Sequence, residues 1–260
     1  MRTLIVAVAA ATGLSLATGV AAASSADNAW IYYAHPVIAG AQEATLVGSV
    51  DVDGTCVIPV GSALPPQNTV ASVDETAFNP DLCQSKVLIS ATDDAEDTPD
   101  SAQKDEGDAA AEIGTSANGT DAAILATRSA GYYKSYYEDP VQLDVNSVTN
   151  STTWSWNGSS VLSSPGPVGG YHYGWFKGSG WSLKENNWQN TYTSNQTTSS
   201  SYVHYRNGTF CATIDTHTYY DRNNVHGRKD GWLLGNVNAR KKGGCTSLLS
   251  FHTKLKRTKN

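Results

Sequence analysis

A two-residue period of apolar and polar side chains is the feature that most restricts how this chain can fold. The period recurs through the second half of the sequence, in LDVNSV, TTWSWNG, SYVHYRNG, FCATIDTHTYY and SLLSFHTKL. Such alternation indicates strands with one face turned to a core. Asn-Gly pairs at 157–158 and 207–208 suit two-residue hairpin turns. We therefore predict an antiparallel β domain over 123–260, folded as a sandwich or a partly closed barrel.

The preceding part of the chain, 24–92, also has the composition of strands. Its β-branched and aromatic runs are AWIYYA, ATLVGSVDVDG and TCVIPV. Within this small β-rich region NPDLCQSKVL predicts a short helix, with Asn79 as N-cap and Pro80 at the first helical position. Asp51 and Asp53 resemble the opening of a calcium loop, but the remaining ligands are missing, so a hairpin turn is the preferred interpretation.

The first 23 residues have the pattern of a cleaved signal peptide. Arg2 precedes a run of small apolar residues that ends in three alanines, a pattern that suits signal peptidase. No later segment has the roughly 18 uninterrupted apolar residues of a transmembrane helix, so we predict no membrane span. The expected product is a secreted, extracellular protein that begins near Ser24.

Four cysteines constrain this secreted chain further. Outside the cell an even number of cysteines indicates disulfides. Four cysteines allow three pairings, and their spacing favours Cys56–Cys83 and Cys211–Cys245. The chain lacks CxxC and HxxxH pairs, and it lacks the phosphate-loop and dinucleotide fingerprints. The sequence therefore predicts neither a metal site nor a cofactor.

Charge is distributed unevenly along the chain. Residues 93–121 hold ten acidic residues and Lys104, whereas residues 222–260 hold ten Lys or Arg residues and Asp230. The segment 93–122 contains no aromatic residue, which predicts a disordered acidic linker. One interpretation is two solvated segments. The alternative is a toxin or polyanion binder whose basic C-terminal end binds an acidic polymer once the linker no longer masks it.

The segment around Asp215 and His217 is the candidate catalytic site. A turn at Asn207-Gly208 would set Tyr205 opposite Phe210 and would place Asp215 and His217 on one polar face. These two side chains, assisted by Tyr219 or His226, would serve as general acid and base in a secreted hydrolase. The favoured interpretation is a solvated face, in which Asp215 forms a cross-strand ion pair with Lys241.

Aromatic residues supply the candidate binding surface. Exposed rings in a secreted β domain stack on sugars, whereas buried rings fill the core, and the core is the favoured interpretation. The candidate residues are Trp154, Trp156, Tyr171, Tyr173, Trp175 and Trp181.

The stretches YYEDPVQLDVNSV, NGTFCATIDTHTYYDRNNVHGRKDG and GGCTSLL are similar to a pattern of secreted proteins of unknown function from actinobacteria and filamentous fungi. The resemblance covers most of 131–260 and implies export and a β-rich body. Together with the aromatic residues it favours a non-enzymatic protein that binds a polysaccharide or another cell-envelope polymer. The sequence predicts no particular oligomeric state.

Overall fold

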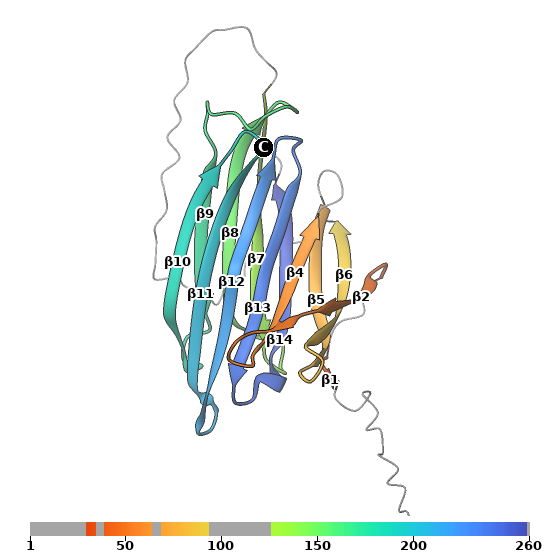
Figure 1. The fold of residues 1–260 in the computed structure, drawn as a ribbon, viewed down its shortest axis with the longest axis vertical. Helices are drawn as coiled ribbons and strands as arrows, with labels where there is room; N and C mark the ends of the chain where they lie inside the picture. Colours follow the sequence, from red (N-terminus) through yellow and green to blue (C-terminus); the bar gives the residue numbers. More distant parts are fainter. Residues whose placement is uncertain (1–29, 35–38, 64–68, 94–125, 259–260) are drawn as a thin grey trace, which may run out of the picture.

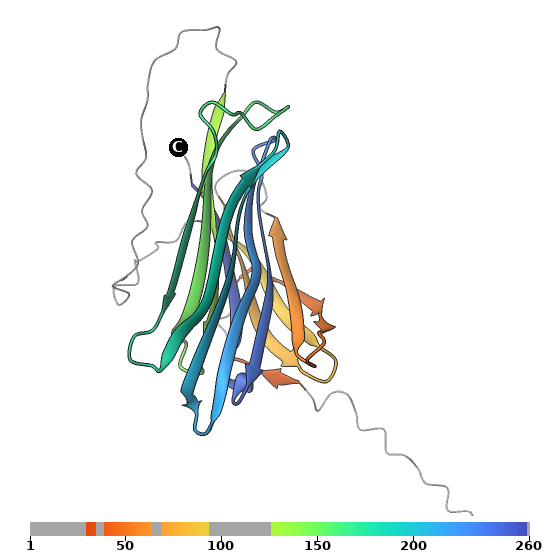
Figure 2. The same cartoon turned by 60° about the vertical axis from the view of Figure 1, so that its left-hand side comes forward.

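The computed structural model describes residues 30–34, 39–63, 69–93 and 126–258, which form two antiparallel sheets facing each other (Figures 1 and 2). The eight-stranded sheet has the order β2-β6-β5-β14-β7-β8-β9, with β1 paired to β5. Its strands are β1 (Ile31–Tyr32), β2 (Gln42–Val47), β5 (Thr69–Asn79), β6 (Gln84–Asp93), β7 (Thr127–Glu138), β8 (Asp144–Trp156), β9 (Val168–Trp175) and β14 (Ser250–Thr258).

The six-stranded sheet has the order β10-β11-β12-β13-β4-β3. Its strands are β3 (Ser49–Val50), β4 (Cys56–Ala63), β10 (Trp181–Tyr192), β11 (Gln196–Cys211), β12 (Ile214–Arg228) and β13 (Leu233–Gly243). In the described part of the chain the one helical element is the 3-10 helix η2 (Thr246–Leu248). The predicted antiparallel sandwich is confirmed, and its two sheets do not close into a barrel.

Strands from both sides of residues 94–125 are mixed within each sheet. β5 lies between β6 and β14, and β4 lies between β13 and β3. The regions before and after the predicted linker 93–122 therefore belong to one sandwich and share one hydrophobic cluster. The predicted signal peptide 1–23 and all but the first residue of the predicted acidic linker lie outside the described residues.

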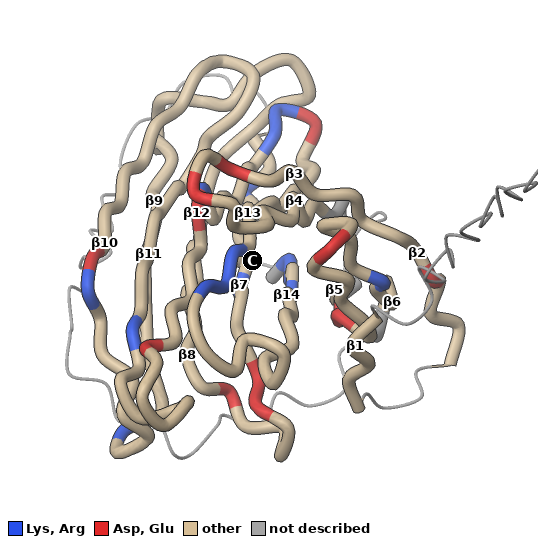
Figure 3. Tube along the Cα trace, turned by 60° about the horizontal axis from the view of Figure 1, so that its bottom comes forward, with Lys and Arg blue, Asp and Glu red and all other residues tan. Residues whose placement is uncertain are grey.

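The C-terminal strand β14 lies inside the eight-stranded sheet, where the sequence suggested a basic end open to an acidic polymer. It pairs with β5 along one edge and with β7 along the other. Leu255 is fully buried, and Arg257 Nη2 donates to Ser129 Oγ at 2.8 Å. The basic residues of β14 thus belong to a paired strand and not to a free tail. Figure 3 shows Lys and Arg interspersed with Asp and Glu over the described fold.

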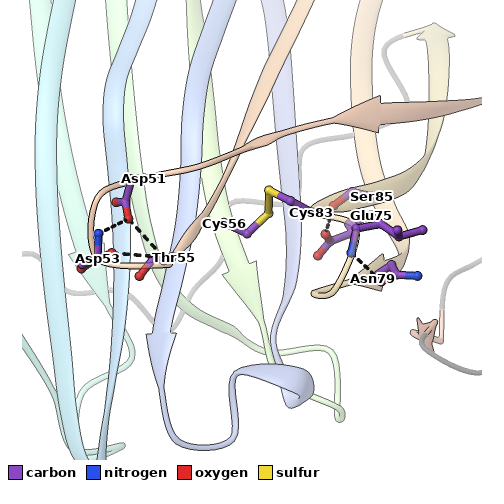
Figure 4. The surroundings of a disulfide bond; sticks show 9 residues. Asp51, Asp53, Thr55, Cys56, Glu75, Asn79, Cys83 and Ser85 are labelled. Carbon is purple, nitrogen blue, oxygen red and sulfur yellow. Dashed lines mark hydrogen bonds between the residues drawn. A yellow bond between two sulfur atoms is a disulfide. The ribbon is translucent and has the colours of Figure 1, made fainter. Parts of the chain in front are cut away.

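Both predicted disulfides are confirmed. Cys56–Cys83 joins the start of β4 to the turn between β5 and β6, and so links the two sheets (Figure 4). Cys211–Cys245 joins the end of β11 to the segment that follows β13. The expected turn at Asp51 and Asp53 is also present, since both carboxylates accept the backbone N–H of Thr55.

The short helix expected from Asn79 onward is wrong. The chain makes a turn from Pro80 to Cys83, with Cys83 at a φ of 50°, and then enters β6 at Gln84. Asn79 Oδ1 accepts the N–H of Leu82 at 3.0 Å, so this side chain caps a turn rather than a helix. Burial of Val87 and Leu88 on opposite faces of β6 favours the extended conformation over the helix signal at its start.

The hairpin turn expected at Asn207-Gly208 is also wrong. Both residues lie inside β11, and the turn falls at Ala212-Thr213, which sets Tyr205 opposite Thr218. Asn207 Oδ1 accepts the N–H groups of Thr209 and Phe210. Its Nδ2 donates to the backbone oxygen of Ser179, in the connection between β9 and β10. Because Asn207 is fully buried and bonded in this way, it serves as a tertiary contact instead of a turn residue.

Polar side chains occupy the middle of the sandwich. Asn150 Oδ1 on β8 accepts hydrogen bonds from Ser201 Oγ at 2.6 Å and from Asn223 Nδ2 at 2.8 Å, and its Nδ2 lies 3.3 Å from Ser199 Oγ. Asn223 Oδ1 accepts in turn from Ser135 Oγ on β7. All five side chains are buried. The network therefore ties β7 and β8 of one sheet to β11 and β12 of the other.

The Asn150→Ala variant should lose about 3 kcal/mol of unfolding free energy, because it leaves several buried donors and acceptors unpaired. Chemical denaturation measures this loss. The matched control is Asn187→Ala on the exposed side of β10, which should change the free energy of unfolding by less than about 0.5 kcal/mol. Equal stability of the two variants would contradict a structural role for the network.

Candidate functional site

An aromatic row lies along β9, an edge strand of the eight-stranded sheet. Tyr171, Tyr173 and Trp175 occupy alternate positions and so share one face of the strand. The ring centroids of Tyr171 and Tyr173 are 5.4 Å apart, and those of Tyr173 and Trp175 are 6.4 Å apart with nearly parallel planes. Trp175 also packs against Tyr205 in the core. The Trp175 end of the row therefore contacts the core, while the row as a whole lies on an edge strand of the sheet.

Trp188 on β10 extends this row onto the other sheet. Its ring stacks on Tyr171 with a centroid distance of 6.4 Å and an interplanar angle of 13°. Its Nε1 donates to Ser199 Oγ at 2.9 Å, and Ser199 belongs to the buried network around Asn150. Trp188 nevertheless keeps 40% of its surface exposed. A large ring is thus held in one orientation at the molecular surface.

The strand that carries Trp188 is open to solvent along much of its length. β10 is an edge strand, and every residue of 184–189 is exposed, so both faces of the strand are accessible there. The other exposed residues of this stretch carry amide or charged side chains: Lys184, Glu185, Asn186, Asn187 and Gln189. We call Tyr171, Tyr173, Trp175 and Trp188 the aromatic edge.

The six predicted binding residues separate into two groups. Trp154 and Trp181 are buried, at 1% and 5% exposure, and belong to the core. The other four, Trp156, Tyr171, Tyr173 and Trp175, are partly buried and pack against that core. The predicted set did not include Trp188, although the stretch NNWQNTY, with Trp188 and Tyr192 an even number of positions apart, would place both rings on one face of a strand.

The predicted catalytic pair Asp215 and His217 share the outer face of β12, but each has a different partner. Asp215 Oδ2 lies 2.7 Å from Arg206 Nη2, instead of forming the expected ion pair with Lys241. His217 Nδ1 lies 2.9 Å from His204 Nε2. The expected pairing of Asp215 with Lys241 failed because the register between β12 and β13 differs, with Thr218 opposite Lys241.

Stacked rings continue across this outer face. His204 stacks on Tyr219 with a centroid distance of 4.2 Å, and the guanidinium of Arg240 lies 4.0 Å from the centre of the Tyr219 ring. Arg240 also pairs with Asp51 and Asp221. Tyr219 is therefore enclosed between an imidazole and a cation, which is a packing arrangement for a side chain on a sheet face.

His226, the other proposed assistant, has both ring nitrogens occupied. Nδ1 lies 2.9 Å from Thr198 Oγ1, and Nε2 lies 3.1 Å from Asn236 Nδ2. The structure therefore does not bring His226 together with Asp215 and His217 as one acid–base constellation.

The hydrogen bond between His204 and His217 requires at least one uncharged imidazole, because one ring must accept the hydrogen bond that the other donates. Burial, followed by the charges of His217 and Arg240, lowers the pKa of His204 to about 4. Burial likewise lowers the pKa of His217, which Asp215 partly opposes. Because the folded pKa of His204 is below its unfolded value of about 6.5, the unfolded chain binds more protons between these values. This pair therefore loses its stabilising effect as the pH falls from about 6.5 to about 4.

We expect NMR titration of the intact protein to give a pKa of about 4 for His204. In His217→Gln this pKa should rise, since one charge repulsion is removed, yet stay below 6.5 because burial remains. The His172→Gln variant, changed on β9 in the other sheet, should leave the His204 titration unaltered. A wild-type pKa near 6.5, or no response to His217→Gln, would contradict the hydrogen-bonded pair.

A Ser–His–Asp arrangement that sequence reasoning missed lies on the eight-stranded sheet. His252 Nδ1 is 3.0 Å from Asp74 Oδ1, and its Nε2 is 2.9 Å from Ser250 Oγ. Glu138 Oε2 lies 3.4 Å from the same Nε2. Burial alone would lower the pKa of His252, but Asp74 and Glu138 outweigh this effect and raise it. Asp74, Ser250 and His252 are all buried, at 9%, 6% and 5% exposure, so these three side chains form a polar network inside the fold and the Ser250 hydroxyl is not exposed to solvent.

A second buried ion pair joins the two sheets. Lys241 Nζ lies 3.4 Å from Glu75 Oε2 and donates at 2.6 Å to Tyr33 Oη and to the backbone oxygen of Leu249. Burial lowers the pKa of Lys241, and Glu75 opposes this shift. A cavity of about 20 Å³ adjoins both charges. A single water molecule needs a cavity of roughly 10–15 Å³ on the same measure, so this cavity is too small for an organic ligand.

Within the described ranges, His, Cys, Asp and Glu side chains form no group of three or more that could hold a metal ion. The described part of the chain contains no helix of the length and apolar character needed to cross a bilayer. No protein-family model, curated protein or solved structure matches this chain.

Proposed function

We propose that this chain is a secreted, non-enzymatic protein that binds a polysaccharide of the cell envelope at the aromatic edge. The observation that carries the proposal is Trp188, which is 40% exposed and held between the Tyr171 ring and Ser199 Oγ. The two disulfides support the extracellular part of the proposal, since disulfides persist in oxidising compartments.

A sugar ring has one apolar face of C–H groups and a rim of hydroxyls, and the aromatic edge presents groups of both kinds. The Trp188 ring supplies a flat apolar surface whose orientation is already fixed, so little conformational entropy is lost on binding. The exposed amide of Asn186, which lies two residues from Trp188 on the same face of β10, supplies hydrogen-bond partners for hydroxyls. An open edge strand also suits an extended polymer, which must pass across the site without ending there.

The hydrolase that would use Asp215 and His217 stays a prediction from sequence, as does the toxin or polyanion binder masked by the acidic linker. Among the described residues, the side chains that each alternative would use do not come together into a site. Asp215 is bonded to Arg206, and the basic residues of β14 are part of a paired strand.

Co-sedimentation with insoluble chitin, cellulose, β-1,3-glucan and peptidoglycan tests the proposal. The wild-type protein should bind at least one of these polymers, and Trp188→Ala should weaken that binding roughly tenfold or more, as expected for a central aromatic anchor. Trp188→Phe keeps an aromatic face without the indole N–H, so it should retain most of the affinity.

The matched control is Trp232→Ala, which removes an indole of nearly equal exposure, 38%, from the connection between β12 and β13. This variant should bind like the wild type. The proposal would be overturned if the wild-type protein bound none of the four polymers, or if Trp188→Ala and Trp232→Ala lost the same amount of binding.

A further inference from the structure

A buried amine and a buried carboxyl group meet between the two sheets. Lys241 belongs to β13 of the six-stranded sheet, and Glu75 belongs to β5 of the eight-stranded sheet. Their side chains keep only 7% and 4% exposure, whereas the neighbouring pair Lys242–Asp53 keeps 45% and 38%. Lys and Glu side chains are seldom this buried. The Lys241–Glu75 pair is therefore held where a charge is costly.

The surroundings of the pair favour its uncharged form. Apolar side chains from both sheets line the adjoining cavity, among them Ile58, Val60, Phe78 and Phe251. Burial lowers the pKa of Lys241, although Glu75 opposes the shift. Transfer of one proton from the ammonium to the carboxylate would leave a neutral amine and a neutral carboxylic acid, which an apolar interior accommodates better than two charges. A neutral lysine amine is a nucleophile.

The carboxyl group of Glu75 is polarised by hydrogen-bond donors at both oxygens. Ser85 Oγ donates to Oε1 at 2.5 Å, and the backbone N–H of Phe251 donates to Oε2 at 3.1 Å. Figure 4 shows Ser85 beside Glu75, near the Cys56–Cys83 disulfide. Donors in these positions would stabilise the negative charge that develops on the oxygens when a nucleophile attacks the carboxyl carbon.

The amine is held in place just as firmly. Lys241 Nζ donates at 2.6 Å to Tyr33 Oη and at 2.6 Å to the backbone oxygen of Leu249. It lies 3.4 Å from Glu75 Oε2, the oxygen bonded to the carbon that it would attack. Reacting groups held in contact in this way reach effective molarities on the order of 10⁵–10⁸ M.

We propose that Lys241 and Glu75 condense into an intramolecular isopeptide bond that joins β13 to β5. The Nζ lone pair forms a bond to Glu75 Cδ, and the bond from Cδ to Oε2 breaks. Oε2 takes two protons from Nζ and leaves as one water molecule, which the cavity of about 20 Å³ can hold. Oε1, bonded by Ser85, becomes the amide oxygen, and the remaining N–H can still donate to Leu249. The reaction needs no oxidant and no second substrate.

The isopeptide bond would reinforce the disulfide beside it. Cys56 lines the same cavity, so two covalent links between the sheets would lie together, and the amide would persist where the disulfide is reduced. Glu75 and Lys241 are 166 residues apart in sequence, so the bond would close a large part of the chain into one loop. The proposal uses no residue of the aromatic edge and stands apart from polysaccharide binding.

Cleavage of the reduced and denatured protein with hydroxylamine tests this inference. Hydroxylamine cuts Asn-Gly bonds, and the chain has three of them, after Asn118, Asn157 and Asn207. Glu75 falls in the first fragment and Lys241 in the last. Each disulfide lies within a single fragment, so neither holds two fragments together. The first and last fragments of wild-type protein should therefore remain joined, and the uncut protein should be lighter than its sequence by one water molecule.

Two lysine variants provide the comparison. Lys241→Arg keeps a positive charge but supplies a guanidinium that does not attack a carboxyl group, so its fragments should separate completely. The matched control is Lys242→Arg, which changes the exposed neighbour and should leave the first and last fragments joined. Mass spectrometry of the joined species should place the branch between Lys241 and Glu75. The inference is overturned if the wild-type fragments separate, if Lys241→Arg stays joined, or if the branch lies at other residues.

Discussion

The hydrogen bonds of Asn150 are the interaction on which the sandwich depends. The side-chain oxygen of Asn150 accepts hydrogen bonds from Ser201 and Asn223, and its amide nitrogen donates to Ser199. A single residue of β8 therefore joins two strands of the facing sheet. Apolar packing is non-directional and tolerates a slipped strand, whereas buried amides and hydroxyls must meet their partners. The network therefore fixes the relative position of the sheets, and through Ser199 it also fixes the orientation of Trp188.

The sequence predicted those features that depend on local pattern. Alternation identified the strand class, and an even number of cysteines in a chain predicted to be exported led to both disulfides. The mixing of strands from residues 24–92 with later strands in both sheets could not be predicted from sequence, because contacts between residues distant in sequence determine which strands become neighbours. The Ser-rich start of β11 contains few apolar residues, and the network around Asn150 explains how it forms a buried strand.

Errors in register limited the prediction of the site. The Asn-Gly pair at 207–208 is a strong hairpin signal, yet Asn207 is used to bond the connection between β9 and β10. Moving the turn to Ala212 brought His204 beside His217, a contact that the expected register did not contain. The same limit hid Asp74 and His252, which are 178 residues apart in sequence. By contrast, the sequence correctly placed Asp215 and His217 on one face of β12, because that prediction required only the alternation of side chains along a strand.

Native-state hydrogen exchange tests most directly whether the polar network holds the two sheets together. The backbone amides of β8, β11 and β12 next to Asn150, Ser201 and Asn223 should exchange only through global unfolding, and they should be as protected as the amides of β5, which contributes no side chain to the network. Exchange of these amides through local opening, with β5 still protected, would contradict the central role of the network.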